Sequence, residues 1–118
     1  MPMTSSSRAR GVARAPLSPS RFRSLPWATV AGCRVRIADR PLARLLGLAL
    51  LKRERAAPGL LIPRCRSVHT FGMRFVLDLA FLDRNGAVIS RRPNVPPGRV
   101  VFERRAVAVL ERPAQPAS

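Results

Sequence analysis

The sequence predicts a small α+β domain that is mostly β. Short runs of apolar and β-branched residues, separated by turn-forming residues, recur between positions 33 and 111. Only the stretch at 41–50 repeats its apolar residues with the period of a helix. About six short strands combined with one helix define a β-rich α+β fold.

The first expected strand and the helix are adjacent in the chain. Residues 33–37, CRVRI, alternate apolar and basic side chains, as a strand with one buried face does. Asp39 is placed to cap the helix, and Pro41 stands in its first turn. Gly47 costs the helix about 1 kcal/mol relative to alanine, so we expect another residue to pack closely against it. The apolar stripe of the helix consists of Leu42, Leu45, Leu46, Ala49 and Leu50.

The remaining strands are expected from residue 60 onward. Residues 75–83, FVLDLAFLD, have the clearest β-branched and aromatic composition. The pair Asn85 and Gly86 predicts a type I′ hairpin turn, in which both central residues have positive φ. An antiparallel return strand follows at 87–90, and then a loop at 94–98. Further short strands are expected at 60–62, 99–103 and 106–111.

Composition divides the chain into one domain, residues 27–112, and two disordered tails, 1–26 and 113–118. The first tail is rich in Arg, Ser and Pro and contains no acidic residue, so it has little apolar surface to bury. No run of 18 apolar residues is present, and the N-terminus lacks the apolar segment of a secretory signal. We therefore expect a cytoplasmic protein without a membrane span, with Cys33 and Cys65 as reduced thiols.

The net charge of +16 makes nucleic acid a possible partner of the basic surface. Arginine supplies 21 of the 22 basic residues, and these arginines are scattered along the chain. A GC-rich genome would produce the same bias through its codons. Aromatic residues for stacking on bases are few, at five Phe and one Trp. Charge alone therefore favours a solvated basic surface over a dedicated nucleic-acid site.

The segment CRSVHTFGMRF, residues 65–75, contains the only histidine of the chain. Cys65, His69 and Met73 resemble a set of soft-metal ligands. In a strand, however, residues four apart are separated by about 13 Å, which is too far for side chains to share one ion. We therefore expect neither a metal site nor a cofactor.

Two other interpretations of this segment remain. Cys65 lies between two arginines, which would favour its thiolate, and His69 could serve as its base in a Cys-His enzyme. No third orienting residue can be assigned. Alternatively, an extended segment would place Cys65, Ser67, His69, Phe71 and Met73 on one core-facing side. We favour this structural interpretation, in which His69 is a buried, hydrogen-bonded imidazole.

Asp78 is the other informative position. It shares a strand face with Val76, Ala80 and Leu82, and a buried carboxylate there needs a partner. Arg44, the charged residue within the apolar helix, and His69 are the candidates. We hypothesise that Arg44, His69 and Asp78 converge; the alternative is that Asp78 faces solvent on an edge strand.

Three stretches resemble the bacterial and archaeal family called domain of unknown function 192, over about residues 27–112: RLLGLALL, the segment 59–89 and AVAVLE. The matching residues are Arg44 and Gly47 in the helix, Phe71 and Met73, and Asp78. Cys65 and the run at 69–73 match a short subgroup. Val76 stands where relatives often have proline, and Gln115 lies near the place of a glycine. The resemblance implies a compact sandwich- or barrel-like fold of mostly antiparallel strands, and no known activity.

The sequence as a whole favours a small binding or accessory module over an enzyme. Its expected partner is a small ligand or a protein. The expected ligand pocket is floored by a set of five side chains: Arg44, Cys65, His69, Met73 and Asp78. Arg44 would pair with an anionic group, and His69 would donate or accept a hydrogen bond. The alternatives are a basic nucleic-acid-binding module and the Cys-His enzyme.

Overall fold

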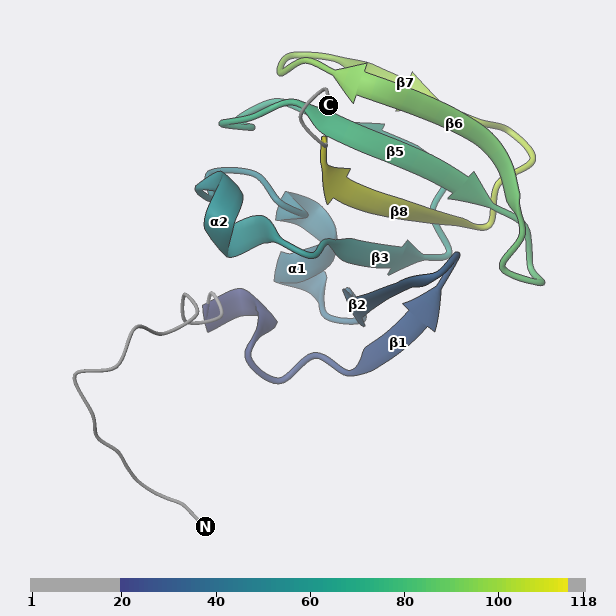
Figure 1. Ribbon diagram of the computed structural model, residues 1–118, viewed down its shortest axis with the longest axis horizontal. Coiled ribbons are helices and arrows are strands. Elements are labelled where there is room, and N and C mark those ends of the chain that lie inside the picture. Colours follow the sequence, from purple (N-terminus) through teal and green to yellow (C-terminus); the bar gives the residue numbers. More distant parts are fainter. Residues whose placement is uncertain (1–19, 115–118) are drawn as a thin grey trace, which may run out of the picture.

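A computed structural model describes residues 20–114 as a mostly β, α+β domain, which confirms the predicted class (Figure 1). Six strands form one sheet in the order β1-β2-β3-β8-β5-β6, and β4 pairs with β7 in a separate two-stranded sheet. The strands are β1 (Trp27–Val30), β2 (Cys33–Ile37), β3 (Leu60–Pro63), β4 (Ser67–His69), β5 (Leu77–Leu82), β6 (Val88–Val95), β7 (Val100–Phe102) and β8 (Ala108–Pro113).

The six-stranded sheet is mixed and not wholly antiparallel as predicted. Strands β2 and β3 are parallel neighbours, whereas the other pairs are antiparallel. Parallel neighbours need a crossover connection. Here the connection contains the expected short helix, α1 (Pro41–Leu46), and one further helical turn, α2 (Arg53–Ala56).

The folded chain extends beyond the expected domain limits of 27 and 112. A short 3-10 helix, η1 (Ser20–Phe22), lies within the predicted tail 1–26, and Phe22 and Leu25 are buried in the core. At the other end Pro113 completes β8, and Ala114 is buried. Two large apolar residues were enough to anchor a segment whose composition indicated disorder. The rest of the two predicted tails, 1–19 and 115–118, lies outside the described residues.

Helix α1 is shorter than the apolar stripe indicated. It ends at Leu46, because Gly47 follows with φ +54° and forms the C-terminal cap. Leu50, the last residue of the predicted stripe, is 62% exposed. Asp39 is not the cap either, since Arg40 occupies that position and makes no side-chain capping bond. The side chains of Leu42 and Leu45 lie outside the described part of the structure.

The hairpin between β5 and β6 uses a different turn from the predicted type I′. Gly86 has positive φ, at +81°, but Asn85 does not. The N–H of Gly86 donates to the carbonyl of Asp83 at 3.0 Å, and the Asp83 carboxylate accepts from the N–H groups of Asn85 and Ala87. Asp83 thus organises a longer turn in which only the glycine is left-handed. β6 then continues to Val95, into the region expected to be a loop.

The two faces of the six-stranded sheet bury different clusters. The main core lies on one face, beneath η1, α1, α2 and β4, and it receives Leu77, Leu79 and Phe81 from β5. Ala80 and Leu82, which alternate with them, belong to a smaller cluster on the other face. A residue's place along β5 or the adjacent β8 therefore decides which face it reaches.

Candidate functional site

A buried acidic residue, Glu111, lies on the main-core face of β8. Its neighbours across the sheet are Leu60 of β3 and Leu79 of β5, both fully buried. Glu111 itself is only 3% exposed. Sequence reasoning treated this residue as the end of a short strand and did not select it. The signal available was its alternation with Val109, which places both residues on the same face.

The Glu111 carboxyl group reaches the end of α1. The backbone N–H of Leu48 donates a hydrogen bond to it, whereas its Oε1 atom has no hydrogen-bond partner in the described residues. A Cβ atom at Gly47 would lie 2.6 Å from this Oε1. The close neighbour expected for Gly47 is therefore confirmed, and it is Glu111. Only glycine leaves room for the carboxyl group.

Arg21, from η1, contacts the residues that follow α1. Its guanidinium donates to the carbonyl oxygens of Gly47, at 3.1 Å, and of Ala49. Burial lowers the pKa of Arg21, and the charge of Glu111 partly offsets this effect. The arginine thus holds the residues that follow α1 against the carboxyl group.

Burial raises the pKa of Glu111 from its ordinary 4.5 to about 7. Removing a carboxylate from water penalises its charged form, and this effect outweighs the Leu48 N–H and the charge of Arg21, which both lower the pKa. Near neutral pH the group therefore exists in both states. It can accept hydrogen bonds when ionised and donate one when protonated.

A cavity of about 50 Å³ opens beside this carboxyl group. We call it the Glu111 cavity; it is lined by Arg44, Leu46, Gly47, Ile62, Cys65, Ser67, Val68, His69 and Glu111. Three of the five predicted site residues are thus brought together. Arg44 is held by donating to the carbonyl oxygens of Pro63 and Arg64, the latter at 3.3 Å.

Cys65 and His69 both line the cavity but do not bond each other. The Cys65 thiol donates to the carbonyl of Ser67 at 3.1 Å. His69 is exposed, and its ring stacks on that of Phe71 with 5.7 Å between centroids. The expectation of a buried imidazole is therefore wrong.

The reason is that this segment alternates in the opposite phase from the predicted one, so that Val68 and Thr70 are buried and Phe71 is exposed. Within β4 only Val68 is buried, and its neighbours Ser67 and His69 face outward. The next residue, Thr70, is fully buried and has the structural role expected of His69. Its hydroxyl donates to the carbonyl of Pro96 at 2.8 Å and accepts from the N–H of Arg99 at 2.8 Å.

Met73 and Asp78 do not line the Glu111 cavity. Met73 is buried in the main core. Asp78 pairs across the sheet with Arg112, one residue beyond Glu111, and so lies on the opposite face. Its Oδ1 accepts from the N–H of Asn94 at 2.9 Å. The predicted convergence of Arg44, His69 and Asp78 is therefore wrong, and Glu111 is the carboxyl group that lines one cavity with Arg44 and His69.

Residues 20–114 contain no group of three or more His, Cys, Asp or Glu side chains placed to hold a metal ion. Over the same range, no helix is both long and apolar enough to cross a membrane. Both Cys33 and Cys65 are free thiols.

The small mixed sheet, with its crossover helices α1 and α2 and a buried glutamate on β8, defines a compact β-rich domain. Residues 27–118 match the model of DUF192, described as an uncharacterized ACR family, and the chain belongs to this family. The resemblance seen in the sequence is thereby confirmed. No curated protein matches the chain.

Two solved structures share the fold. One is a candidate transcription regulator from Sinorhizobium meliloti 1021, with a TM-score of 0.60 and 24% identity over 69% of this chain and 68% of that one. The other is a protein of unknown function from Novosphingobium aromaticivorans DSM 12444, with a TM-score of 0.55 and 16% identity over 84% of this chain and 89% of that one. At these identities the likeness shows the fold alone.

Proposed function

We propose that the protein is a non-catalytic binding module whose Glu111 cavity holds a compact polar molecule. The observation that carries this proposal is Glu111, which lines the cavity and has a buried Oε1 atom without a hydrogen-bond partner among the described residues. A buried polar atom without a hydrogen bond is costly, on the order of 1–3 kcal/mol. A ligand that donates to Oε1 would remove this cost.

The other polar group of the cavity suggests the second half of the ligand. Arg44 lines the same cavity as the carboxyl group and carries more N–H donors than the two carbonyl bonds use. A molecule that combines a donor for Glu111 with an acceptor for Arg44 fits both. A primary carboxamide has this combination, and its size suits a volume of about 50 Å³.

Acetamide is a suitable first probe, titrated into the isotope-labelled protein and followed by amide chemical shifts. With four non-hydrogen atoms its affinity is bounded at about 6 kcal/mol, so saturation is expected between high micromolar and millimolar concentrations. The shifts should be concentrated at Gly47, Leu48 and Cys65. The Glu111→Gln variant should bind about tenfold more weakly, because a neutral amide oxygen accepts a hydrogen bond more weakly than a carboxylate does.

Asp78→Asn is the matched control, since it also neutralises a carboxyl group but lies on the opposite face of the sheet. It should leave acetamide binding unchanged. Chemical shifts that stay linear up to the highest acetamide concentration would refute the proposal. Equal responses of the Glu111→Gln and Asp78→Asn variants to acetamide would refute it as well.

The Cys-His enzyme receives less support from the geometry. The thiol of Cys65 donates to the Ser67 carbonyl and not to His69, whose ring is stacked on Phe71. A general base must lie within hydrogen-bond reach of its nucleophile. Cys65 should therefore react with alkylating reagents at the same rate in the wild type and in His69→Ala.

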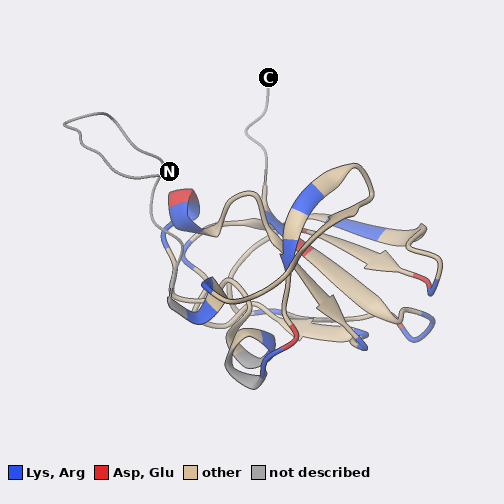
Figure 2. Cartoon of the chain, turned by 90° about the horizontal axis from the view of Figure 1, so that it is seen from below, with Lys and Arg blue, Asp and Glu red and all other residues tan. Residues whose placement is uncertain are grey.

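A basic nucleic-acid-binding module is the second candidate, and one feature favours it. Trp27 is 43% exposed, and the guanidinium groups of Arg34 and Arg36 lie 5.4 and 4.4 Å from its ring centroid. An aromatic ring beside arginines is a surface on which bases stack. Basic residues are otherwise spread over the described part of the chain (Figure 2). The test is the salt dependence of binding to single-stranded DNA. If this surface is used, Arg34→Gln should reduce the slope of log K against log salt by about 0.7, the value of one phosphate contact.

A further inference from the structure

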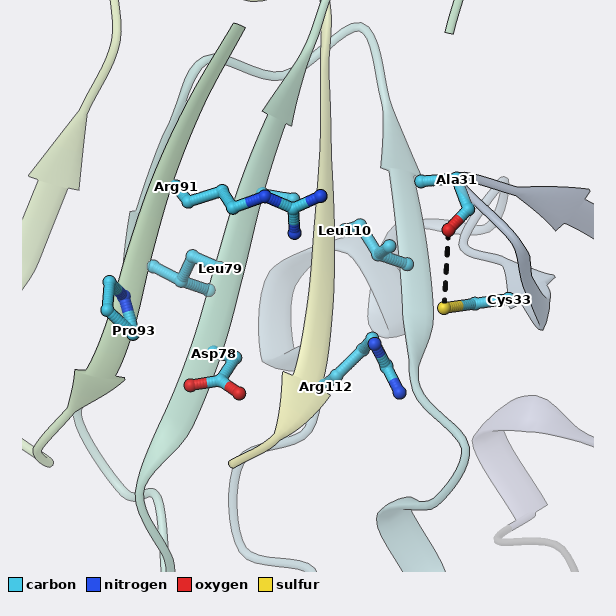
Figure 3. A pocket seen from close by; sticks show the side chains of 9 residues that line it. Ala31, Cys33, Asp78, Leu79, Arg91, Pro93, Leu110 and Arg112 are labelled. Atoms are coloured by element: carbon cyan, nitrogen blue, oxygen red, sulfur yellow. Dashed lines mark hydrogen bonds between the residues drawn. The ribbon is translucent and has the colours of Figure 1, made fainter. Parts of the chain in front are cut away.

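A larger cavity, of about 150 Å³, lies on the opposite face of the six-stranded sheet. Its walls come from the β1–β2 turn and from β5, β6 and β8 (Figure 3). We call it the two-arginine cavity; it is lined by Ala31, Cys33, Asp78, Leu79, Ala80, Arg91, Pro93, Leu110 and Arg112. Because β2 and β6 contribute to one cavity although three strands separate them, the sheet curves around this face.

Two cationic groups are directed to this cavity from different strands. Arg91 extends from β6 across β5 toward β8, and Arg112 projects from β8 toward β3 and Cys33, on the side of β8 away from Asp78 (Figure 3). The register confirms the shared face, since Arg91 pairs with Ala80 and Arg112 pairs with Asp78. Both arginines therefore lie on the face of the sheet that carries this cavity.

Neither arginine is neutralised within the described chain. The ion pairs among residues 20–114 involve Arg92 and Arg105, not these two. The Nε atom of Arg112 is buried and has no hydrogen-bond partner. A buried guanidinium donor without an acceptor is costly, and an anion in the cavity would supply the acceptor. The one carboxylate nearby, Asp78, has its Oδ1 engaged by the N–H of Asn94.

We propose that the two-arginine cavity is a binding site for a small organic carboxylate. Its carboxylate group pairs with Arg91 and Arg112, and its short hydrocarbon part lies against the apolar wall formed by Leu110 and Pro93. The volume suits this class, because a protein cavity of about 150 Å³ can accommodate a molecule the size of benzene.

Asp78 sets the charge of the preferred anion. Two guanidinium groups and one carboxylate leave a local charge of about +1, which a singly charged carboxylate balances. A doubly charged phosphate brings an additional charge toward Asp78 and is disfavoured. The site therefore selects carboxylates over phosphate, which separates it from a surface that attracts anions through its overall charge.

Sodium butyrate is the probe, titrated into the labelled full-length protein at constant ionic strength, with amide and arginine Nε–Hε signals followed by NMR. We expect saturable shifts at Cys33, Asp78 and Arg112, and weaker binding of sodium phosphate. Neutral 1-butanol should bind more weakly still. Arg91→Gln and Arg112→Gln should each weaken butyrate binding about tenfold.

Arg104→Gln is the matched control, because it removes one exposed arginine from the turn after β7. It should change butyrate binding less than about twofold. Asp78→Asn should raise the affinity for phosphate. Glu111→Gln, which tests the other cavity, should leave butyrate binding unchanged. If Arg112→Gln fails to fold, the exposed Arg91 decides the question by itself.

Equal responses to butyrate and phosphate, or an equal loss in Arg104→Gln and Arg91→Gln, would overturn the proposal and indicate attraction by net charge. Shifts at the Glu111 cavity in place of Cys33 and Asp78 would overturn it as well.

Discussion

The pH dependence of folding stability tests the buried state of Glu111. Its pKa is about 7 in the folded protein, against 4.5 in a chain exposed to water. Between these values the folded state binds more protons than the unfolded state, so stability falls as the pH rises. The contribution is fully present below pH 4.5 and is lost as the pH passes through about 7. At about 1.4 kcal/mol for each pH unit, the difference is about 3 kcal/mol.

The assay is urea unfolding of the wild type and of Glu111→Gln between pH 4 and pH 8. Glutamine does not ionise, so the difference between the two curves isolates this carboxyl group. Arg21 acts on Glu111 through its charge, and Arg44, Cys65 and His69 line the same cavity. Histidine is the side-chain type that ordinarily changes charge between about pH 5 and 8. Both proteins are therefore compared in the His69→Ala background.

As the pH rises from 4 to 8, the free energy of unfolding of Glu111→Gln should increase by about 3 kcal/mol relative to that of the wild type. Parallel curves would show that Glu111 titrates as an exposed acid does, and the argument from its burial would fail.

Three further predictions concern stability and use urea unfolding. Gly47→Ala should lower the free energy of unfolding by about 2 kcal/mol or more, because Gly47 has a left-handed φ of +54° and the added Cβ would lie 2.6 Å from Oε1 of Glu111. Gly86→Ala, at φ +81° in open space, should cost less, and equal losses in the two variants would contradict the contact. His69→Ala should cost less than about 0.5 kcal/mol, and a loss above about 1 kcal/mol would restore the structural interpretation of the histidine. Thr70→Val should cost about 1–3 kcal/mol and speed exchange of the Arg99 amide, whereas an unchanged amide would refute the role of the hydroxyl.

Local pattern was sufficient for elements whose alternation is regular. Residues 33–37 form β2 with the predicted bounds, and β5 lies within the predicted 75–83. The helix was predicted to extend too far because its apolar stripe continues past Gly47. In the structure Gly47 ends the helix with a positive φ, at the position where the Glu111 carboxyl group packs against it. β1 was not predicted, since its pairing with β2 is a property of the hairpin and not of its four residues.

The candidate site was predicted in part, for a physical reason. Arg44, Cys65 and His69 meet because α1 and β4 flank the same opening. Asp78 was assigned to them because an isolated strand shows which residues share a face but not which face is covered by the helix. Glu111 was missed because its burial depends on residues distant in the chain, Gly47 and Arg21, and the second of these lay in a segment expected to be disordered.

The position of β8 in the sheet has a consequence for biosynthesis. β8 follows every other described strand in the sequence, yet in the sheet it lies between β3 and β5. Its hydrogen bonds to these two strands join the β1–β3 half of the described sheet to the β5–β6 hairpin. While the chain emerges from a ribosome, these halves have exposed edges that cannot join until the last strand inserts between them. Neither cavity is complete before β8 inserts, because Glu111 of this strand lines the Glu111 cavity and the adjacent Arg112 lines the two-arginine cavity.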